Sequence, residues 1–231
     1  MPMYKTNLTP RLALCARYAE GAHLLADVGT DHGYLPISLL MHGKIDAAVA
    51  ADINPGPLSA ARRHAAEAGY EDKLRFECCD GLDFPGADSC DAVVCAGMGG
   101  ETIMGILSRA PWTKDGARLI LQPQSKLDEL CLWLRENGYG IFDAAVVSEG
   151  RRMYIVLLCR GERSEATYAE EVLAASGDPL LEGWAGARIA RIEKALSGML
   201  KGSGSEAEAD AARSTLSRLE QYANLQPGGK L

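Results

Sequence analysis

The sequence predicts an α/β fold with an open, mostly parallel sheet, followed by an antiparallel hairpin of helices. Short apolar runs alternate with helical patterns as far as Arg160, and the first run leads directly into a glycine turn. Beyond Arg160 the strand signals stop and the composition shifts to Glu, Ala, Arg and Lys. We therefore expect a sheet domain at residues 1–160 and a helical coiled-coil domain at residues 161–231.

Length and composition agree with this division. The chain has 231 residues, of which 47% are hydrophobic, enough for one core plus an appendage. No apolar run approaches the roughly 18 residues that span a bilayer, and no charged segment followed by an apolar one opens the chain, so we expect a soluble, cytoplasmic protein without a membrane partner. The seven cysteines include no C-x-x-C pair and the four histidines share no ligand spacing, so we expect reduced core cysteines and no metal.

The first predicted strand ends in a glycine turn. Leu24–Ala26 leads into the segment Asp27–Leu35, which reads DVGTDHGYL, and a helical stretch follows at Pro36–His42. Glycines let the chain turn sharply and approach a ligand closely, while a helix N-terminus presents unpaired N–H groups. The pattern predicts a Rossmann-type nucleotide site. An ordinary βα turn, in which Gly and Asp are common, is the alternative.

Two aspartates of this turn indicate the kind of nucleotide. Asp31 stands where the G-x-G-x-x-G pattern has its middle glycine, and a carboxylate there would repel a pyrophosphate at the positive helix end. A cofactor with a cationic centre and no phosphate suits both Asp27 and Asp31. S-adenosylmethionine is such a molecule, so we expect it rather than a dinucleotide.

The next three predicted strands also end in an acid or a glycine. They are Lys44–Ala51, Leu74–Cys79 and Asp91–Ala96, with a helix at Pro57–Ala68 after the first. They are followed by Asp52, by Asp80-Gly81-Leu82 and by Gly97-Met98-Gly99-Gly100. Ligands of open α/β sheets bind at the carboxyl edge, so the pattern predicts a site there, with Asp52 accepting hydrogen bonds from ribose hydroxyls. The alternative for a lone aspartate at a strand end is a helix cap.

The predicted sheet closes with a β-hairpin. A helix at Glu101–Arg109, a strand at Ala117–Leu121 and a helix at Lys126–Glu136 continue the alternation. Two β-rich runs, Gly140–Ser148 and Met153–Cys159, then adjoin across a short polar turn, so the last strand must run antiparallel. A seven-stranded sheet of this kind is the methyltransferase variant of the Rossmann architecture. A nicotinamide enzyme more often closes with a sixth parallel strand.

Four short segments stand out together: Asp27–Pro36, Asp80–Leu82, Ala96–Gly100 and Leu119–Gln124. They resemble the successive motifs of the bacterial tRNA adenine-N1 methyltransferases that modify adenine 22 of tRNA. The similarity runs from about Leu8 to Arg160, with a weaker match to that family's C-terminal coiled coil. The resemblance implies a class I methyltransferase that uses S-adenosyl-L-methionine to methylate N1 of an adenine in the D-arm of tRNA.

The resemblance also implies which residues hold the cofactor. Asp52 would bind the ribose hydroxyls, Asp80 and Leu82 would frame the adenine, and Gly29 with Gly33 would face the methionine part. The full predicted cofactor-binding set is Asp27, Gly29, Asp31, Gly33, Asp52, Ile53, Asp80, Gly81, Leu82 and Gly97.

The implied chemistry asks little of the site. An in-line displacement at a sulfonium methyl needs close geometry and a dry pocket, and the adenine must be extruded to reach it. Met98 and its flanking glycines would form the slot for that base. Many N-methyltransferases of amino groups carry Asn-Pro-Pro-Tyr where this chain has Ala96-Gly-Met-Gly99, which fits a ring-nitrogen target. Asp31 and His32 complete the predicted catalytic set, through electrostatics or proton removal, although the cationic product makes a base optional.

Apolar spacing predicts the helical hairpin. Apolar residues recur at alternating spacings of four and three from Ala185 to Met199 and again from Ala209 to Ala223, separated by a Gly-Ser break at residues 202–205. Two such seams predict antiparallel helices, with a further helix at Glu162–Ala175 leading in.

Basic residues lie off the first seam and supply the substrate-side prediction. They form either a solvated face or a surface that contacts phosphates. The predicted substrate-binding set is Arg11, Gly99, Arg188, Arg191 and Lys194. The net charge of −7 is unusual for an RNA-binding protein, so tRNA binding would need a local basic patch. That patch would combine Arg11, Arg17, Lys126, Arg151 and Arg152 with the helical cluster.

Three alternatives stay open at this point. A methyltransferase of a small molecule or a protein would keep the nucleotide site and use the hairpin for dimerisation or as a lid, and the acidic surface favours it. An NAD-dependent oxidoreductase would have to bind pyrophosphate over Asp31. A non-catalytic interaction protein would keep a relic nucleotide fold and bind no cofactor.

Overall fold

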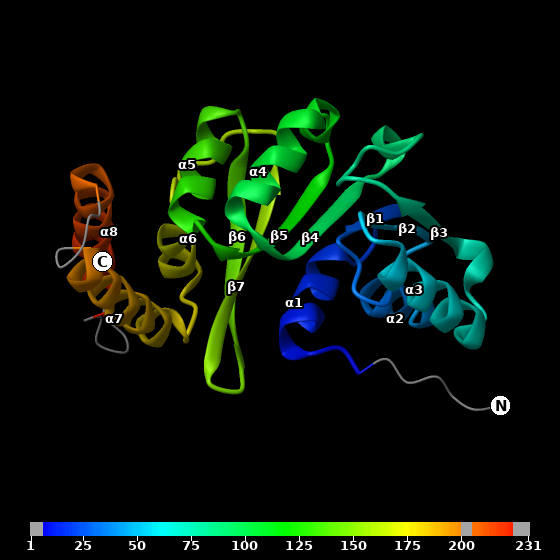
Figure 1. Ribbon diagram of the computed structural model, residues 1–231, viewed down its shortest axis with the longest axis horizontal. Coiled ribbons are helices and arrows are strands. Elements are labelled where there is room, and N and C mark those ends of the chain that lie inside the picture. The colour runs from blue at the N-terminus through cyan, green and yellow to red at the C-terminus, as the bar shows by residue number, and fades with distance from the viewer. Residues whose placement is uncertain (1–6, 200–204, 224–231) are drawn as a thin grey trace.

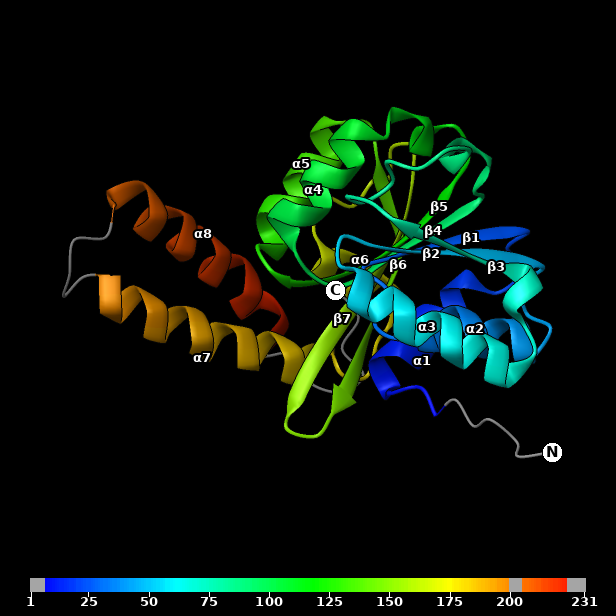
Figure 2. The same ribbon diagram turned by 45° about the vertical axis from the view of Figure 1, so that its right-hand side comes forward.

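The computed structural model describes residues 7–199 and 205–223. A seven-stranded sheet has the order β3-β2-β1-β4-β5-β7-β6, with helices on both faces and two more helices extending to one side (Figures 1 and 2). The strands are β1 Leu24–Val28, β2 Ala47–Asp52, β3 Leu74–Cys78, β4 Ala92–Gly99, β5 Arg118–Ser125, β6 Gly140–Glu149 and β7 Arg152–Arg160. The helices are α1 Pro10–Ala19, α2 Tyr34–Met41, α3 Pro55–Ala68, α4 Gly100–Arg109, α5 Leu127–Glu136, α6 Ala169–Ser176, α7 Leu181–Met199 and α8 Glu206–Ala223.

The predicted strand directions are confirmed. β1 to β5 pair in parallel, and β7 runs antiparallel to both of its neighbours, β5 and β6. β1 pairs with β2 on one side and with β4 on the other, so the strand order reverses between β1 and β4. A crevice at such a switch point, beyond the carboxyl ends of the strands, is the usual ligand site of an open α/β sheet.

Strand register brings the predicted motifs to one edge. Val28 at the end of β1 is opposite Ala51 of β2 and opposite Cys95 of β4. Asp52 is opposite Cys78 at the end of β3. The segments that follow these strands therefore begin at the same level of the sheet.

Alternate residues of the central strands form two apolar cores, one on each face of the sheet. One core contains Leu25, Ala48 and Val94 and is covered by α1, α2 and α3. The other contains Ala26 and Val93 and is covered by α4, α5 and α6, with the inner ends of α7 and α8 against it (Figure 2). This near-continuous burial explains why the central strands are apolar without alternation.

The segment after β7 differs from its prediction. A helix was expected at Glu162–Ala175, but α6 begins only at Ala169. Residues 162–164 instead pass directly over Gly140, where a Cβ would lie 2.4 Å from the backbone nitrogen of Ser164. The Ile141 N–H also donates a hydrogen bond to the Ser164 hydroxyl, at 3.0 Å. Close contact with β6 keeps this stretch irregular rather than helical, and the spacing of apolar residues in the sequence does not reveal that contact.

α6 itself packs on β6 and belongs to the core of the sheet. Ala169, Val172 and Leu173 are buried in the same cluster as the strands. The covering of the sheet thus continues beyond the expected domain boundary at residues 160/161.

α7 and α8 form the predicted antiparallel hairpin, here called the arm. The seam residues are buried or half-buried on both helices. They are Ala185, Ile189, Ile192, Leu196 and Met199 on α7, and Ala209, Ala212, Leu216, Leu219 and Ala223 on α8. Of the predicted break at 202–205, residues 202–204 lie outside the described residues.

The cysteines are free thiols, and five of the seven are buried; Cys78 is exposed and Cys79 partly so. No helix of the described chain is long and apolar enough to cross a membrane. Within residues 7–199 and 205–223, no group of three or more His, Cys, Asp or Glu side chains is arranged to hold a metal ion.

Candidate active site

The glycine turn after β1 is held against β2 by its backbone. The N–H groups of Gly29 and Thr30 both donate to the carbonyl of Ala51, at 2.8 and 3.0 Å. Gly29 has φ +70° and Gly33 has φ +71°, a region that favours glycine. Gly33 is the N-terminal cap of α2, so the turn presents the first N–H groups of that helix toward the sheet edge.

Asp27 is a buried carboxylate beneath this turn. It is 6% exposed, and its Oδ2 accepts a hydrogen bond from the Thr30 hydroxyl at 2.6 Å. Burial raises the pKa of Asp27 to about 6, the Thr30 hydrogen bond opposes this, and the charges of Asp31 and Asp52 add to it. Three acidic side chains therefore concentrate negative potential at this edge, which favours a ligand with a cationic centre.

Met98 lies across the glycine turn. A Cβ added at Gly29 would be 2.3 Å from the Met98 Cε, so the side chain reaches from the end of β4 to the end of β1. This places Met98 over the switch point of the sheet. The structure thus brings together a predicted catalytic residue and a predicted cofactor-binding glycine from segments about 70 residues apart.

Asp52 and Ile53 form the next part of the edge. The Oδ1 of Asp52 accepts a hydrogen bond from the Asn54 N–H at 2.7 Å, which fixes the carboxylate beside the start of α3. Ile53 is 66% exposed, an unusual state for a large apolar side chain. A carboxylate next to an exposed apolar side chain suits a ribose and its adjoining base.

The Asp80–Leu82 turn is anchored by a residue that the sequence interpretation missed. Arg109 at the end of α4 contacts Asp80 at 2.9 Å and Asp83 at 3.5 Å. Gly81 has φ +69° and packs on α4, where a Cβ would be 2.8 Å from a side-chain carbon of Ile106. Leu82 is buried in the core, so its side chain supports the turn from beneath.

Asp31 and His32 lie together at the rim of the site. The Nε2 of His32 is 3.1 Å from the Asp31 Oδ1, and both side chains are exposed to solvent. His32 has φ +61°, and its carbonyl accepts a hydrogen bond from the Nδ1 of His64 at 3.0 Å. The His32 ring also lies 5.7 Å from that of Tyr34. The two predicted catalytic groups at this rim therefore lie within the glycine turn and face solvent.

Gln122, within β5, is a second residue that carried no predicted role. It is fully buried, and its Oε1 accepts hydrogen bonds from the Arg11 Nη1 at 2.8 Å and from the Gly97 N–H at 3.0 Å. The Arg11 guanidinium also lies over the ring of Tyr154, 5.4 Å from its centroid. One amide thus holds the turn that carries Met98 and a predicted substrate-binding arginine. Its signal in the sequence was a polar residue directly after an apolar run.

Gly99 and Gly100 let two turns pass closely. A Cβ on Gly99 would be 3.2 Å from the Ser125 hydroxyl, and one on Gly100 would be 2.5 Å from the Lys126 carbonyl oxygen. The β4–α4 turn therefore packs backbone to backbone on the β5–α5 turn. Gly99 is positioned by this contact.

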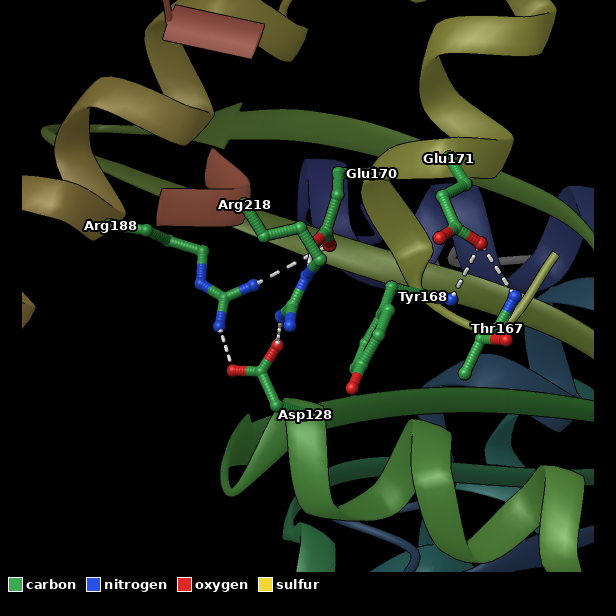
Figure 3. Close-up of polar contacts among 7 residues, drawn as sticks. All are labelled: Asp128, Thr167, Tyr168, Glu170, Glu171, Arg188 and Arg218. Atoms are coloured by element: carbon green, nitrogen blue, oxygen red, sulfur yellow. Dashed lines mark hydrogen bonds and ion pairs between the residues drawn. The ribbon is translucent and has the colours of Figure 1, made fainter. Parts of the chain in front are cut away.

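Arg188 is not on an exposed face, so that part of the prediction is wrong. Its residue exposure is 7%, and its Nη2 is 2.5 Å from the Asp128 Oδ2 of α5 (Figure 3). Its guanidinium also lies over Trp184, 4.9 Å from the ring centroid. Arg191 and Lys194, by contrast, are exposed. Apolar spacing could not reveal this burial, because the partner lies 60 residues away in the chain.

The strand order and the glycine turn at its switch point define the class of the protein as a methyltransferase, and residues 8–157 match the family described as Methyltransferase domain. The chain is 32% identical to the tRNA (adenine(22)-N(1))-methyltransferase of Bacillus subtilis over 167 residues, which are 72% of this chain and 70% of that protein. It belongs to the family of tRNA (adenine(22)-N(1))-methyltransferases.

Two further comparisons agree with this assignment. A tRNA methyltransferase relative from Mycoplasma pneumoniae is 33% identical over 147 residues, which are 63% of this chain and 67% of that protein. The crystal structure of Streptococcus pneumoniae Sp1610 in complex with S-adenosyl-L-methionine superposes with a TM-score of 0.78 at 27% identity, covering 94% of this chain and 100% of that one. The predicted family and fold are confirmed, and the NAD-dependent alternative is excluded.

Proposed function

We propose that this protein transfers a methyl group from S-adenosyl-L-methionine to N1 of adenine 22 in the D-arm of tRNA. The observation that carries the proposal is the meeting of Met98 with Gly29 at the switch point, in a chain whose B. subtilis relative is named for this reaction. A cofactor held by the glycine turn and a base held beside Met98 would then lie next to each other.

The donor set of the site fits S-adenosyl-L-methionine. Asp52 would accept hydrogen bonds from the ribose hydroxyls, and Ile53 would cover one face of the adenine. The buried Asp27 and the exposed Asp31 would stabilise the cationic end of the cofactor, and the N–H groups near Gly33 would meet its carboxylate. When bound, the cofactor supplies an already activated methyl group.

The protein's own contribution is to bind and orient the base. Met98 and the neighbouring glycines would form the slot, and Gln122 would keep the Gly97 backbone in the shape that the slot requires. Extruding a base from its stack costs a few kcal/mol, which contacts elsewhere on the tRNA must offset. A ring nitrogen has a free lone pair, so the reaction needs no base to take a proton before transfer.

We assign the tRNA contacts outside the slot to local positive charge. Arg191 and Lys194 are exposed on α7, and Arg11 lies beside the Gly97 turn. Reversing the charges of Arg191 and Lys194 together should weaken tRNA binding and lower its salt slope by about two. A Lys44→Glu control changes a charge at the opposite edge of the sheet and should leave the slope unchanged.

A cytoplasmic location, where tRNA is found, stays a prediction.

Methyl transfer from labelled cofactor to bulk tRNA tests the proposal. A methyl group at N1 blocks the Watson–Crick edge, so reverse transcriptase should stop at adenine 22 in treated tRNA only. Label in small molecules or proteins with none in tRNA would reject the proposal. That result would favour the second candidate, a methyltransferase of smaller substrates, which the net charge of −7 supports.

A further inference from the structure

Four charged side chains meet where the arm joins the methyltransferase domain. They are Asp128 at the start of α5, Glu170 at the start of α6, Arg188 in the inner half of α7 and Arg218 near the end of α8 (Figure 3). We call this cluster the joint. Its two carboxylates and two guanidiniums balance in charge, and each comes from a different helix.

The joint is compact and almost closed to solvent. Arg188 contacts Asp128 at 2.5 Å and Glu170 at 4.0 Å, and Arg218 contacts the same two carboxylates. The Arg218 guanidinium also lies over Tyr168, 3.5 Å from the ring centroid. The side chain of Glu170 is 1% exposed and that of Arg188 is 8% exposed. Each guanidinium therefore bridges an acid of α5 and an acid of α6.

Geometry, rather than net stability, is what such a cluster contributes. Desolvation offsets much of the attraction between buried ions, whereas the planar Arg218 guanidinium, hydrogen-bonded to both carboxylates, restricts the angles that its partners adopt. The apolar residues Leu181, Trp184, Leu219 and Tyr222 already bury the base of the arm. Apolar contacts alone would let the base of the arm slide over the methyltransferase domain, and the ion pairs of the joint oppose that movement.

The position of the outer half of the arm depends on the angle at which the joint holds α7. From Arg191 to Met199 no residue of α7 is buried, and the half-buried residues of that part are those of its seam with α8. Eleven residues of α7 follow Arg188, about 16 Å of helix, so a tilt of about 10° at the joint would move the outer end by about 3 Å. Arg191 and Lys194 lie on this outer part of α7.

The joint is also connected to the base slot. Asp128 lies six residues after Gln122 and two after Lys126, whose carbonyl packs on Gly100. The β5–α5 turn that packs on the Met98 segment therefore leads directly into the first turn of α5, whose Asp128 contacts the arm. Resting on the proposed function, we propose that Asp128, Glu170, Arg188 and Arg218 are positioning residues that set the arm at the angle required for one tRNA to occupy both the arm and the base slot.

Asp128→Asn in the full chain tests this, with Asp210→Asn as a matched control. Asp210 makes an exposed ion pair with Arg213 on α8, at 2.6 Å. For Asp128→Asn we expect the KM for tRNA to rise about tenfold, with kcat at saturating tRNA and the Kd for S-adenosyl-L-methionine each within twofold of wild type. X-ray scattering should change from that of one rigid shape to that of several arm angles. Asp128→Glu should recover part of the KM, and Asp210→Asn should change none of these quantities.

A wild-type KM for tRNA in folded Asp128→Asn would overturn the proposal, as would equal losses in KM and cofactor affinity, which indicate general destabilisation. If Asp128→Asn does not fold, Glu170→Gln is measured by the same criteria. If the wild-type protein methylates no tRNA, the proposed function fails, and the scattering comparison still decides whether the joint sets the arm angle.

Discussion

At the scale of single residues, Asp27 is the carboxylate of the site that burial penalises most directly. Asp27 is buried, its pKa is raised to about 6, and its only hydrogen-bond donor among the described side-chain contacts is Thr30. A buried, poorly compensated charge destabilises a fold and marks a functional position when a ligand of opposite charge fits beside it.

The raised pKa of Asp27 gives stability a defined pH dependence. Burial raises that pKa from 3.8 to about 6, so the folded protein holds this proton more tightly than the unfolded chain and loses stability as pH rises through this window. Asp27→Asn should remove this dependence, and the difference in unfolding free energy should shift in favour of the variant by about 2 kcal/mol between pH 4 and 6.5. Urea unfolding across that range measures it. Parallel pH curves for the two proteins would contradict it.

Asp52 should contribute to cofactor binding without supporting the fold. It is only partly buried and its structural hydrogen bond is local, to Asn54. Asp52→Ala is expected to weaken S-adenosyl-L-methionine binding by roughly 1 to 3 kcal/mol through loss of a charged acceptor. Calorimetry measures this, with the exposed Asp72→Ala as control. Unchanged affinity in folded Asp52→Ala would remove the ribose assignment.

Gln122 should matter for stability as well as for the slot. Gln122→Met removes the acceptor shared by Arg11 and the Gly97 N–H, and leaving such donors buried without a partner costs about 1–3 kcal/mol. We expect a decrease of that size in the free energy of unfolding. Gln221→Met, the same change at an exposed site on α8, should stay within about 0.5 kcal/mol. Equal effects of the two substitutions would show that the shared hydrogen bonds contribute little.

At the scale of elements, the sequence predicted what depends on local pattern. Apolar runs placed the seven strands, the polar turn before β7 placed the antiparallel strand, and 4-3 spacing placed α7 and α8. Long-range contacts produced the differences. The stretch before α6 is irregular rather than helical because it crosses Gly140, and Arg188 is buried because Asp128 and Glu170 contact it from other segments. Long-range contacts are also the reason that the sequence did not reveal the roles of Gln122 and Arg109, because those roles depend on partners far away in the chain.

The packing of α6 determines after which residue the chain can be cut to remove the arm. It covers β6 with Ala169, Val172 and Leu173, so we propose that the methyltransferase unit ends after Gly177 rather than at Arg160. A chain cut after Gly177 should fold, bind S-adenosyl-L-methionine nearly normally and methylate tRNA poorly. A chain cut after Gly161 exposes that face of the sheet and should unfold at lower urea concentration. Full tRNA methylation by the chain cut after Gly177 would assign the arm to stability or assembly instead.

At the scale of the whole molecule, a net charge of −7 must coexist with an anionic partner. The joint keeps two of the arm's arginines for internal ion pairs, so the exposed positive charge that remains on α7 is small and local. Specificity should therefore come from fitting one tRNA against two distant features, the arm and the base slot, rather than from general attraction to phosphate. Binding should be weak and sensitive to salt.

The most direct measurement compares one tRNA with a second in which guanine replaces adenine 22. Both are methylated under the same conditions with labelled S-adenosyl-L-methionine, and the modified position is mapped by reverse transcription. The account predicts label and a reverse-transcription stop at position 22 in the first tRNA, and neither in the second. Equal methylation of the two tRNAs, or a stop at another position in both, would contradict it.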